Sequence, residues 1–291
     1  MLTGLILCVA TGVVWTLVGI LYSRASQRDG RSFVPFMAAY SLVFVLTTWT
    51  AGHPVAAPMR EVALTGACEL AAAFFGQLGF LALYLAMRRG GHGVVWSLAQ
   101  SALAVPFLCG VLFFGNRPGV LPYCGVAMVL GAVALIGAAS TGTTIAMNRI
   151  YLLFAFGAML LNGIAQALTL IPGHLGLTPA ALTWRVPFYC LVGLGWWVVL
   201  LVRHESFRFS WYGVLYGIVV AAGQFLLYHA SDCLERRNAT ALAYPIAVGT
   251  CILLMRLYSR FVRRERFSRL EAVGLALLLF GIALMNSTSR L

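Results

Sequence analysis

Two charged residues lie inside apolar stretches of this sequence and carry its most informative chemistry. Glu69 stands eight residues after Glu61, which on a helix is about 12 Å further along the axis. Burying an ionisable side chain that far inside an apolar, membrane-spanning segment costs free energy, so such a residue indicates a functional site. We predict that Glu69 takes up and releases a coupling proton. Pairing with an arginine, or exposure to a water-filled vestibule, is the alternative.

Arg185 is the second candidate. It lies just before Pro187, six residues into an apolar run. Its guanidinium could hold the carboxylate or phosphate of a substrate, or it could extend to the polar end of its helix. Arg256 is spaced by four from Arg260, which predicts a stripe toward a charged face. Glu265 lies among arginines, which predicts pairing within its loop.

Aromatic and amide side chains recur at matched positions in the two halves of the sequence. Trp96 and Tyr244 each follow a pair of arginines by seven residues, and together they could enclose a flat or cationic ligand. Gln77 and Gln224 each follow a glycine and could bind a substrate or each other. Anchoring at an interface and helix packing are the alternatives. The predicted substrate-binding residues are Trp15, Gln77, Trp96, Gln100, Asn162, Arg185, Gln224, Tyr228 and Tyr244.

The composition shows what must position these residues. Of 291 residues, 61% are hydrophobic and 10% are charged, whereas soluble domains carry about 25% charged residues. This excludes a soluble domain, a disordered chain and a coiled coil. About 20 apolar residues cross a bilayer, so the sequence predicts an all-α integral membrane protein with ten transmembrane helices. We place them at 2–22, 33–51, 62–87, 92–114, 119–139, 149–171, 179–202, 210–230, 239–259 and 270–287.

Short motifs recur at nearly constant offsets. The sequence Val-Pro-Phe at 34–36 recurs at 186–188, Gly76-Gln77 recurs as Gly223-Gln224, and Gly125 matches Gly274. These offsets of 152, 147 and 149 residues indicate an old duplication. We predict two five-helix repeats, 1–140 and 149–287, joined by a linker at 141–148. Because five is odd, the second repeat must be inverted in the membrane.

Arginine placement predicts the orientation. The net charge is +12, and all 20 basic residues are Arg. Alternate connections carry 13 of them, and the opposite face carries 5. The arginine-rich face is predicted to be cytoplasmic and both termini external, in what is expected to be a bacterial inner membrane. The charge is thereby explained without nucleic acid. The seven cysteines are scattered singly, so no metal, disulfide or cofactor is predicted. The apolar N-terminal segment is predicted to be the first membrane span and not a signal peptide.

Several of these residues resemble a known family. Glu265-Arg266-Phe267-Ser268, followed by Gly274 and Gly281, is similar to the end of an EamA-like half in the drug/metabolite transporter superfamily. Ala243-Tyr244-Pro245-Ile246, followed by Gly249, resembles a segment of the small multidrug resistance proteins. The first apolar run, however, lacks the proton-binding glutamate of those proteins. Their proton–drug antiport therefore does not carry over.

The resemblance implies a secondary transporter that moves a small polar or amphipathic metabolite by alternating access between the two repeats. Protons as coupling ion, or no coupling ion, both fit the residues. A multidrug exporter or a sugar-porter-like branch is an alternative, the latter suggested by Gln100–Phe107. A channel or a structural membrane protein is a third possibility. No motif of a membrane enzyme is present in the sequence, so we predict no enzymatic activity. Oligomeric state and substrate identity do not follow from the sequence.

Overall fold

The computed structural model is all-helical over the residues it describes, which are 2–27, 33–51, 54–89, 91–115, 119–141, 149–204, 210–235, 243–265 and 268–285. No strand occurs in these segments. The α-helices are α1 (Leu2–Gln27), α2 (Phe33–Ala51), α3 (Met59–Met87), α4 (His92–Gln100), α5 (Ala104–Leu112), α6 (Val120–Thr141), α7 (Arg149–His174), α8 (Pro179–Leu182), α9 (Arg185–Gly193), α10 (Gly195–Val202), α11 (Trp211–Glu235), α12 (Ala243–Phe261) and α13 (Arg269–Met285). A 3₁₀ turn, η2 (Ser101–Leu103), joins α4 to α5.

Helical structure coincides with each of the ten predicted apolar runs, but two runs are interrupted. The run at 92–114 contains η2, and the run at 179–202 is divided into α8, α9 and α10. Pro187 falls within the first turn of α9, where its missing N–H costs no intrahelical bond. The run predicted at 149–171 extends three residues further, because α7 continues through Pro172 to His174, and the break before α8 falls at 175–178.

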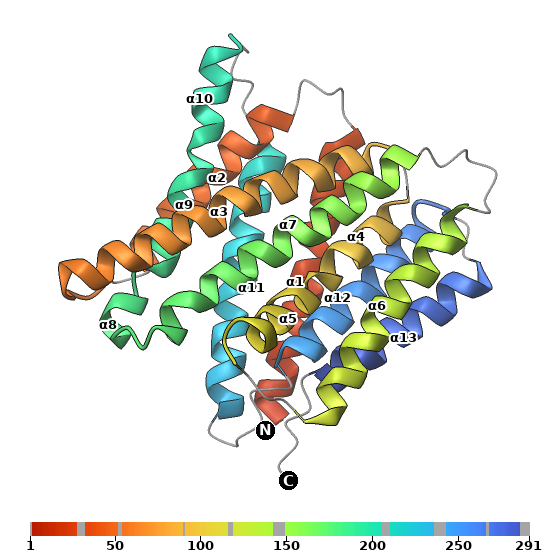
Figure 1. The fold of residues 1–291 in the computed structure, drawn as a ribbon. Coiled ribbons are helices and arrows are strands. Elements are labelled where there is room, and N and C mark those ends of the chain that lie inside the picture. Colours follow the sequence, from red (N-terminus) through yellow and green to blue (C-terminus); the bar gives the residue numbers. More distant parts are fainter. Residues whose placement is uncertain are drawn as a thin grey trace.

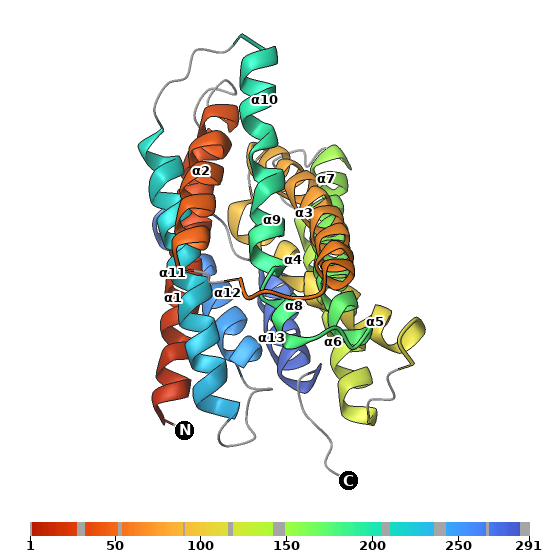
Figure 2. The same ribbon diagram turned by 90° about the vertical axis from the view of Figure 1, so that its left-hand side faces the viewer.

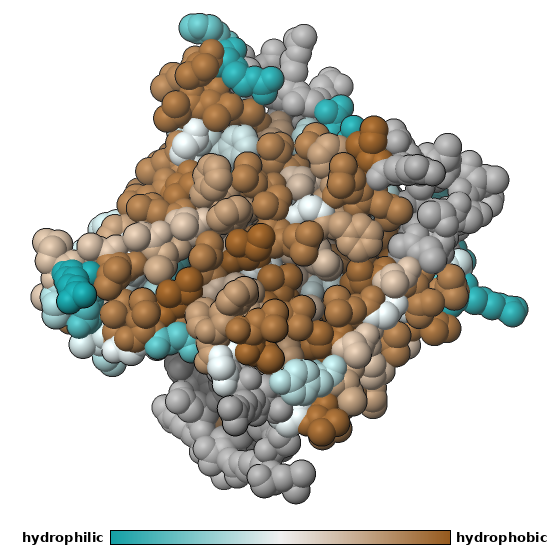
Figure 3. Space-filling model, in the orientation of Figure 1, coloured by the Kyte–Doolittle hydropathy of each residue, from teal (hydrophilic) through white to brown (hydrophobic). Residues whose placement is uncertain are grey.

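Within the described residues, six helical segments are long and apolar enough to cross a membrane, which is compatible with a multi-pass membrane protein. They are Leu2–Ser26, Phe33–Thr50, Met59–Met87, His92–Leu112, Ile150–His174 and Pro179–Val202. Apolar side chains cover most of the face formed by α3 and α7 (Figure 3), and Phe74, Leu153 and Leu160 are among those exposed. Surface of this kind is expected where helices face lipid.

The helices pack in a small number of long pairs (Figure 1; the perpendicular view is Figure 2). Helix α3 lies along α7, α6 lies along α13, and α1 lies against both α11 and α12. Helix α2 contacts α11 on one side and α9 and α10 on the other, while α4 and α5 contact α7. The pairs with the most extensive contacts, α3–α7, α6–α13 and α1–α11, join helices that are far apart in the sequence.

A cluster of aromatic rings forms the centre of one group of helices. Tyr22 of α1 is fully buried against Phe33 and Phe36 of α2 and Tyr216 of α11. Its hydroxyl donates a hydrogen bond to the carbonyl oxygen of Phe80 in α3 at 2.5 Å. One side chain thus connects α1, α2, α3 and α11, so the core is shared between segments from both ends of the chain.

The α6–α13 pair meets at two glycines. A methyl group added at Gly125 would lie 2.6 Å from the carbonyl oxygen of Gly281, and one added at Gly281 would lie 2.8 Å from the carbonyl oxygen of Gly125. The obstructing atoms belong to backbone, which cannot rotate away. Glycine at both positions is therefore what lets the two backbones approach.

Gly125→Ala is expected to lower the free energy of unfolding by about 1–3 kcal/mol through overpacking. Unfolding with SDS in mixed micelles measures the change. Gly131→Ala on the same helix is the matched control, because its added methyl group would lie at an ordinary 3.5 Å from Leu277. Equal stability of the two variants would contradict a backbone contact at Gly125.

Candidate functional site

Glu69 and Arg185 lie together in the structure. The Nε atom of Arg185 on α9 is 3.7 Å from Oε1 of Glu69 on α3. The Glu69 side chain is 2% exposed, whereas that of Arg185 is 30% exposed. The sequence singled out both residues, and pairing of Glu69 with an arginine was one of its two interpretations. The structure identifies Arg185 as that arginine.

Small residues on α3 allow the other elements of the site to approach. A methyl group at Gly76 would lie 2.5 Å from the hydroxyl oxygen of Tyr189 on α9, and one at Gly79 would lie 2.6 Å from Oδ1 of Asn162 on α7. Polar groups of α7 and α9 therefore lie directly against the backbone of α3. Asn162, one of the predicted residues, is brought to the same helix as Glu69. Tyr189 was missed, because a tyrosine in an apolar run carries no sequence signal.

Gln77 lies two turns beyond Glu69 on α3 and is held by α10. Its Oε1 atom accepts a hydrogen bond from Nε1 of Trp196 at 2.7 Å. Its Nε2 atom lies 3.6 Å from where a methyl group at Gly193 would be. The predicted site residues Glu69, Gln77, Asn162 and Arg185 thus share one interface, between α3 and the elements α7, α9 and α10.

The remaining predicted residues lie elsewhere. Trp96 is buried, donates to Sγ of Cys251 at 3.1 Å and packs on Gly19. Trp15 packs against Gly223 of α11. Gln100 on α4 and Gln224 on α11 are half-buried. Tyr228 and Tyr244 fall within α11 and α12, but their side chains lie outside the described residues, so the aromatic pair of Trp96 and Tyr244 stays a prediction.

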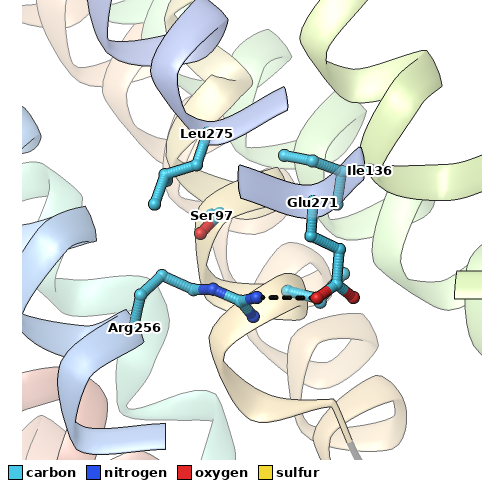
Figure 4. Close-up of a pocket in the computed structure, with 6 residues that line it drawn as sticks. Ser97, Ile136, Arg256, Glu271 and Leu275 are labelled. Atoms are coloured by element: carbon cyan, nitrogen blue, oxygen red, sulfur yellow. Dashed lines mark hydrogen bonds and ion pairs between the residues drawn. The ribbon is translucent and has the colours of Figure 1, made fainter. Parts of the chain in front are cut away.

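A second buried ion pair lies between α12 and α13. Nη2 of Arg256 donates to Oε2 of Glu271 at 3.1 Å, and both side chains are 7% exposed. They line a small pocket whose other walls come from α4, α6 and α13 (Figure 4). Arg256 therefore points into the protein rather than along a stripe toward a charged face.

Glu271 was not selected from the sequence, although a signal was present. Ser268 and Glu271 form a capping box at the start of α13: the amide N–H of Ser268 donates to Oε2 of Glu271 at 3.2 Å, and the amide N–H of Glu271 donates to Oγ of Ser268 at 3.1 Å. The Ser-x-x-Glu spacing is a recognised helix start. Glu271 is thus a structural residue that also balances the charge of Arg256.

Glu265 reaches across to another helix instead of pairing within its own loop. Its Oε1 atom accepts a hydrogen bond from the amide N–H of His92 at 2.8 Å, and its Oε2 atom accepts one from Gly93 at 3.3 Å. A carboxylate at these N–H groups of the first turn of α4 is favoured by the helix dipole. Arg263 donates to Nε2 of His92 at 2.8 Å. This cluster fixes the α12–α13 connection to the start of α4.

Comparison with known proteins supports the fold. No protein-family model matches the chain, and no curated protein matches it. Among 19 matching chains of solved structures, one described as "Crystal structure of protein" is 13% identical to this chain. The match covers 99% of both chains with a TM-score of 0.59. At that identity the likeness shows the fold alone: an all-helical bundle, rich in apolar helices.

Proposed function

We propose that this chain is a secondary carrier of ten membrane-spanning helices, built as two inverted five-helix halves, that moves a small polar or amphipathic metabolite across a membrane. The substrate site lies where α3 of the first half meets α9 of the second. The resemblance to the drug/metabolite transporter superfamily supports this class. The observation that carries the proposal is the Glu69–Arg185 pair, because it joins the two proposed halves through a carboxylate that is 2% exposed.

The packing supports two equivalent halves. Exchanging each first-half segment with its second-half counterpart converts the α3–α7 contact into α11–α1, and the α2–α11 contact into α9–α3. It also converts the contact of α4 and α5 with α7 into that of α12 with α1, and leaves α6–α13 unchanged. All of these contacts occur. A duplicated unit pairing with its copy around a twofold axis has this pattern.

Two glycines repeat the correspondence at atomic detail. A methyl group at Gly12 of α1 would lie 2.6 Å from the carbonyl oxygen of Ala247, and one at Gly163 of α7 would lie 3.0 Å from the carbonyl oxygen of Ala102. Gly12 and Gly163 are separated by 151 residues, and their partners by 145. The same close approach therefore occurs twice: once between Gly12 of the first half and the second half, and once between Gly163 of the second half and the first half.

Contacts between connections support alternate crossings of a membrane. Glu265, after α12, bonds to the start of α4, and the Tyr151 hydroxyl of α7 donates to the carbonyl oxygen of Gly91 at 3.2 Å. At the other end of the bundle the amide N–H of Val55 donates to Oγ1 of Thr183 at 3.0 Å. The first group joins connections that ten crossings place on the arginine-rich face, and the second joins connections placed on the opposite face.

The proposal is tested with purified chain in two steps. A thermal-shift panel of sugars, amino acids, nucleosides, amines, sugar phosphates and small carboxylates first identifies a stabilising compound. Counterflow of that compound into proteoliposomes is then measured. We expect saturable uptake that is accelerated by unlabelled compound on the opposite side. Flux that rises linearly with concentration and shows no counterflow would indicate a channel and contradict the carrier.

A further inference from the structure

The Glu69–Arg185 pair is incompletely bonded, although the two atoms that face each other, Nε of Arg185 and Oε1 of Glu69, are both buried. The 3.7 Å separation of Nε and Oε1 is too long for a hydrogen bond, and neither atom has a hydrogen-bond partner. Thr65, one turn earlier on α3, is fully buried, and its hydroxyl is unpartnered as well. Buried polar atoms in proteins are nearly always hydrogen-bonded. Three unsatisfied groups at one place indicate a site that is completed by another molecule.

The two charges differ in their access to a ligand. Glu69 is enclosed, whereas nearly a third of the Arg185 side chain is exposed. The guanidinium lies beside Gly173 of α7, where a methyl group would be 3.1 Å from Nη2. A residue without a side chain therefore borders the group that offers paired N–H donors. Guanidinium binds a carboxylate through two parallel hydrogen bonds, a geometry that Glu69 does not adopt here.

We propose that the substrate of this carrier is a small carboxylate anion, which binds Arg185 in place of Glu69 while Glu69 takes up one proton. The inference rests on the carrier function proposed above. Before binding, the site holds one guanidinium and one carboxylate. After binding it holds the guanidinium, the substrate carboxylate and a neutral Glu69 carboxyl, so its net charge is unchanged. Two carboxylates beside one guanidinium would leave an uncompensated charge in an apolar interior, which is strongly unfavourable.

Among the titratable groups around the pair, Glu69 itself is the one that takes up this proton. From α9 it faces Arg185 and Tyr189, and on its own helix Cys68 is adjacent. Helix α8 has no titratable residue. On α1, Tyr22 donates to the carbonyl oxygen of Phe80, and Cys8 packs in a separate cluster with Leu227 and Leu234. On α7, Tyr151 donates to the carbonyl oxygen of Gly91, and His174 stacks on Phe114. His92 is the first residue of α4 and lies beyond the C-terminal end of α3.

The test uses the full chain in detergent with pyruvate, lactate and benzoate as probes, each matched to its neutral amide. Calorimetry in two buffers of different ionisation enthalpy counts the protons taken up. We expect at least one carboxylate, and not its amide, to bind with uptake of about one proton. At pH values where Glu69 is ionised before binding, the affinity for that carboxylate should then rise about tenfold for each unit by which the pH falls. Glu69→Gln should bind the same carboxylate without proton uptake and without this pH dependence.

Variants separate binding from folding. Arg185→Gln should lose carboxylate binding, and Arg185→Lys should retain part of it, while size-exclusion chromatography and thermal melting verify that both remain folded. Glu61→Gln is the matched control on α3, because Glu61 bonds to Thr178 outside the pair and its removal should leave proton uptake unchanged. Carboxylate binding without proton uptake, or no binding of any carboxylate, would overturn the inference. Saturable counterflow of a neutral compound or an amine would then leave the carrier function standing, whereas absence of saturable counterflow for every compound would overturn the carrier itself.

Discussion

Arg256→Met is expected to lower the free energy of unfolding by about 3–5 kcal/mol, the loss typical of a buried ion pair from which one partner is removed. Arg256 is 7% exposed and donates to Glu271 at 3.1 Å. Methionine fills much of the same space, so packing changes little. The loss arises because the carboxylate of Glu271 remains buried with its charge uncompensated.

A double variant separates charge from packing. Arg256→Met combined with Glu271→Gln removes both charges, and the glutamine oxygen can still accept the bond from the amide N–H of Ser268. Most of the lost stability should therefore return. Arg260→Met is the matched control one turn along α12, where the side chain is exposed, and a change within about 0.5 kcal/mol is expected there. A double variant as unstable as Arg256→Met would show that packing, not charge, sets the loss.

The positions of the helices were accessible from the sequence. Ten apolar runs predicted where helical segments lie, because the length of an apolar run is a local property. The internal breaks were not accessible. The 3₁₀ turn at Ser101–Leu103 and the division of α8, α9 and α10 depend on how these segments bend over neighbours that no local pattern specifies.

The sequence predicted several residues of the candidate site, but it did not predict which of them contact each other. Glu69 and Arg185 were identified separately, because a charge in an apolar run is visible locally. Their contact was not, since it depends on which face of α3 meets α9. Gln77 shows the same limit: the repeat pattern matched it to Gln224, whereas the structure places it on Trp196. A sequence repeat indicates which positions are equivalent, but it does not indicate which residues each of those positions contacts.

Covalent closure of one face should abolish transport if the two halves alternate. At one end of the bundle the segment before α3 contacts the segment around α8. The amide N–H of Val55 donates to Oγ1 of Thr183 at 3.0 Å, and Nε1 of Trp184 donates to the carbonyl oxygen of Val55 at 2.9 Å. A carrier must separate such contacts to open this face, because its substrate site is reached from each side in turn.

Val55→Cys/Thr183→Cys, oxidised in proteoliposomes, is therefore expected to reduce counterflow to the level of protein-free liposomes, and reduction should restore it. Ala180→Cys/Thr183→Cys is the matched control, because it bridges residues three apart in the sequence that already contact each other, and it should leave counterflow intact. Each single-cysteine variant, oxidised in the same way, reports any pairing with the seven native cysteines. Full counterflow through a chain whose 55–183 bridge is verified by mass spectrometry would mean that this face stays closed throughout the cycle. Substrate would then have to reach Arg185 by another route, since the bridged segments flank the start of α9.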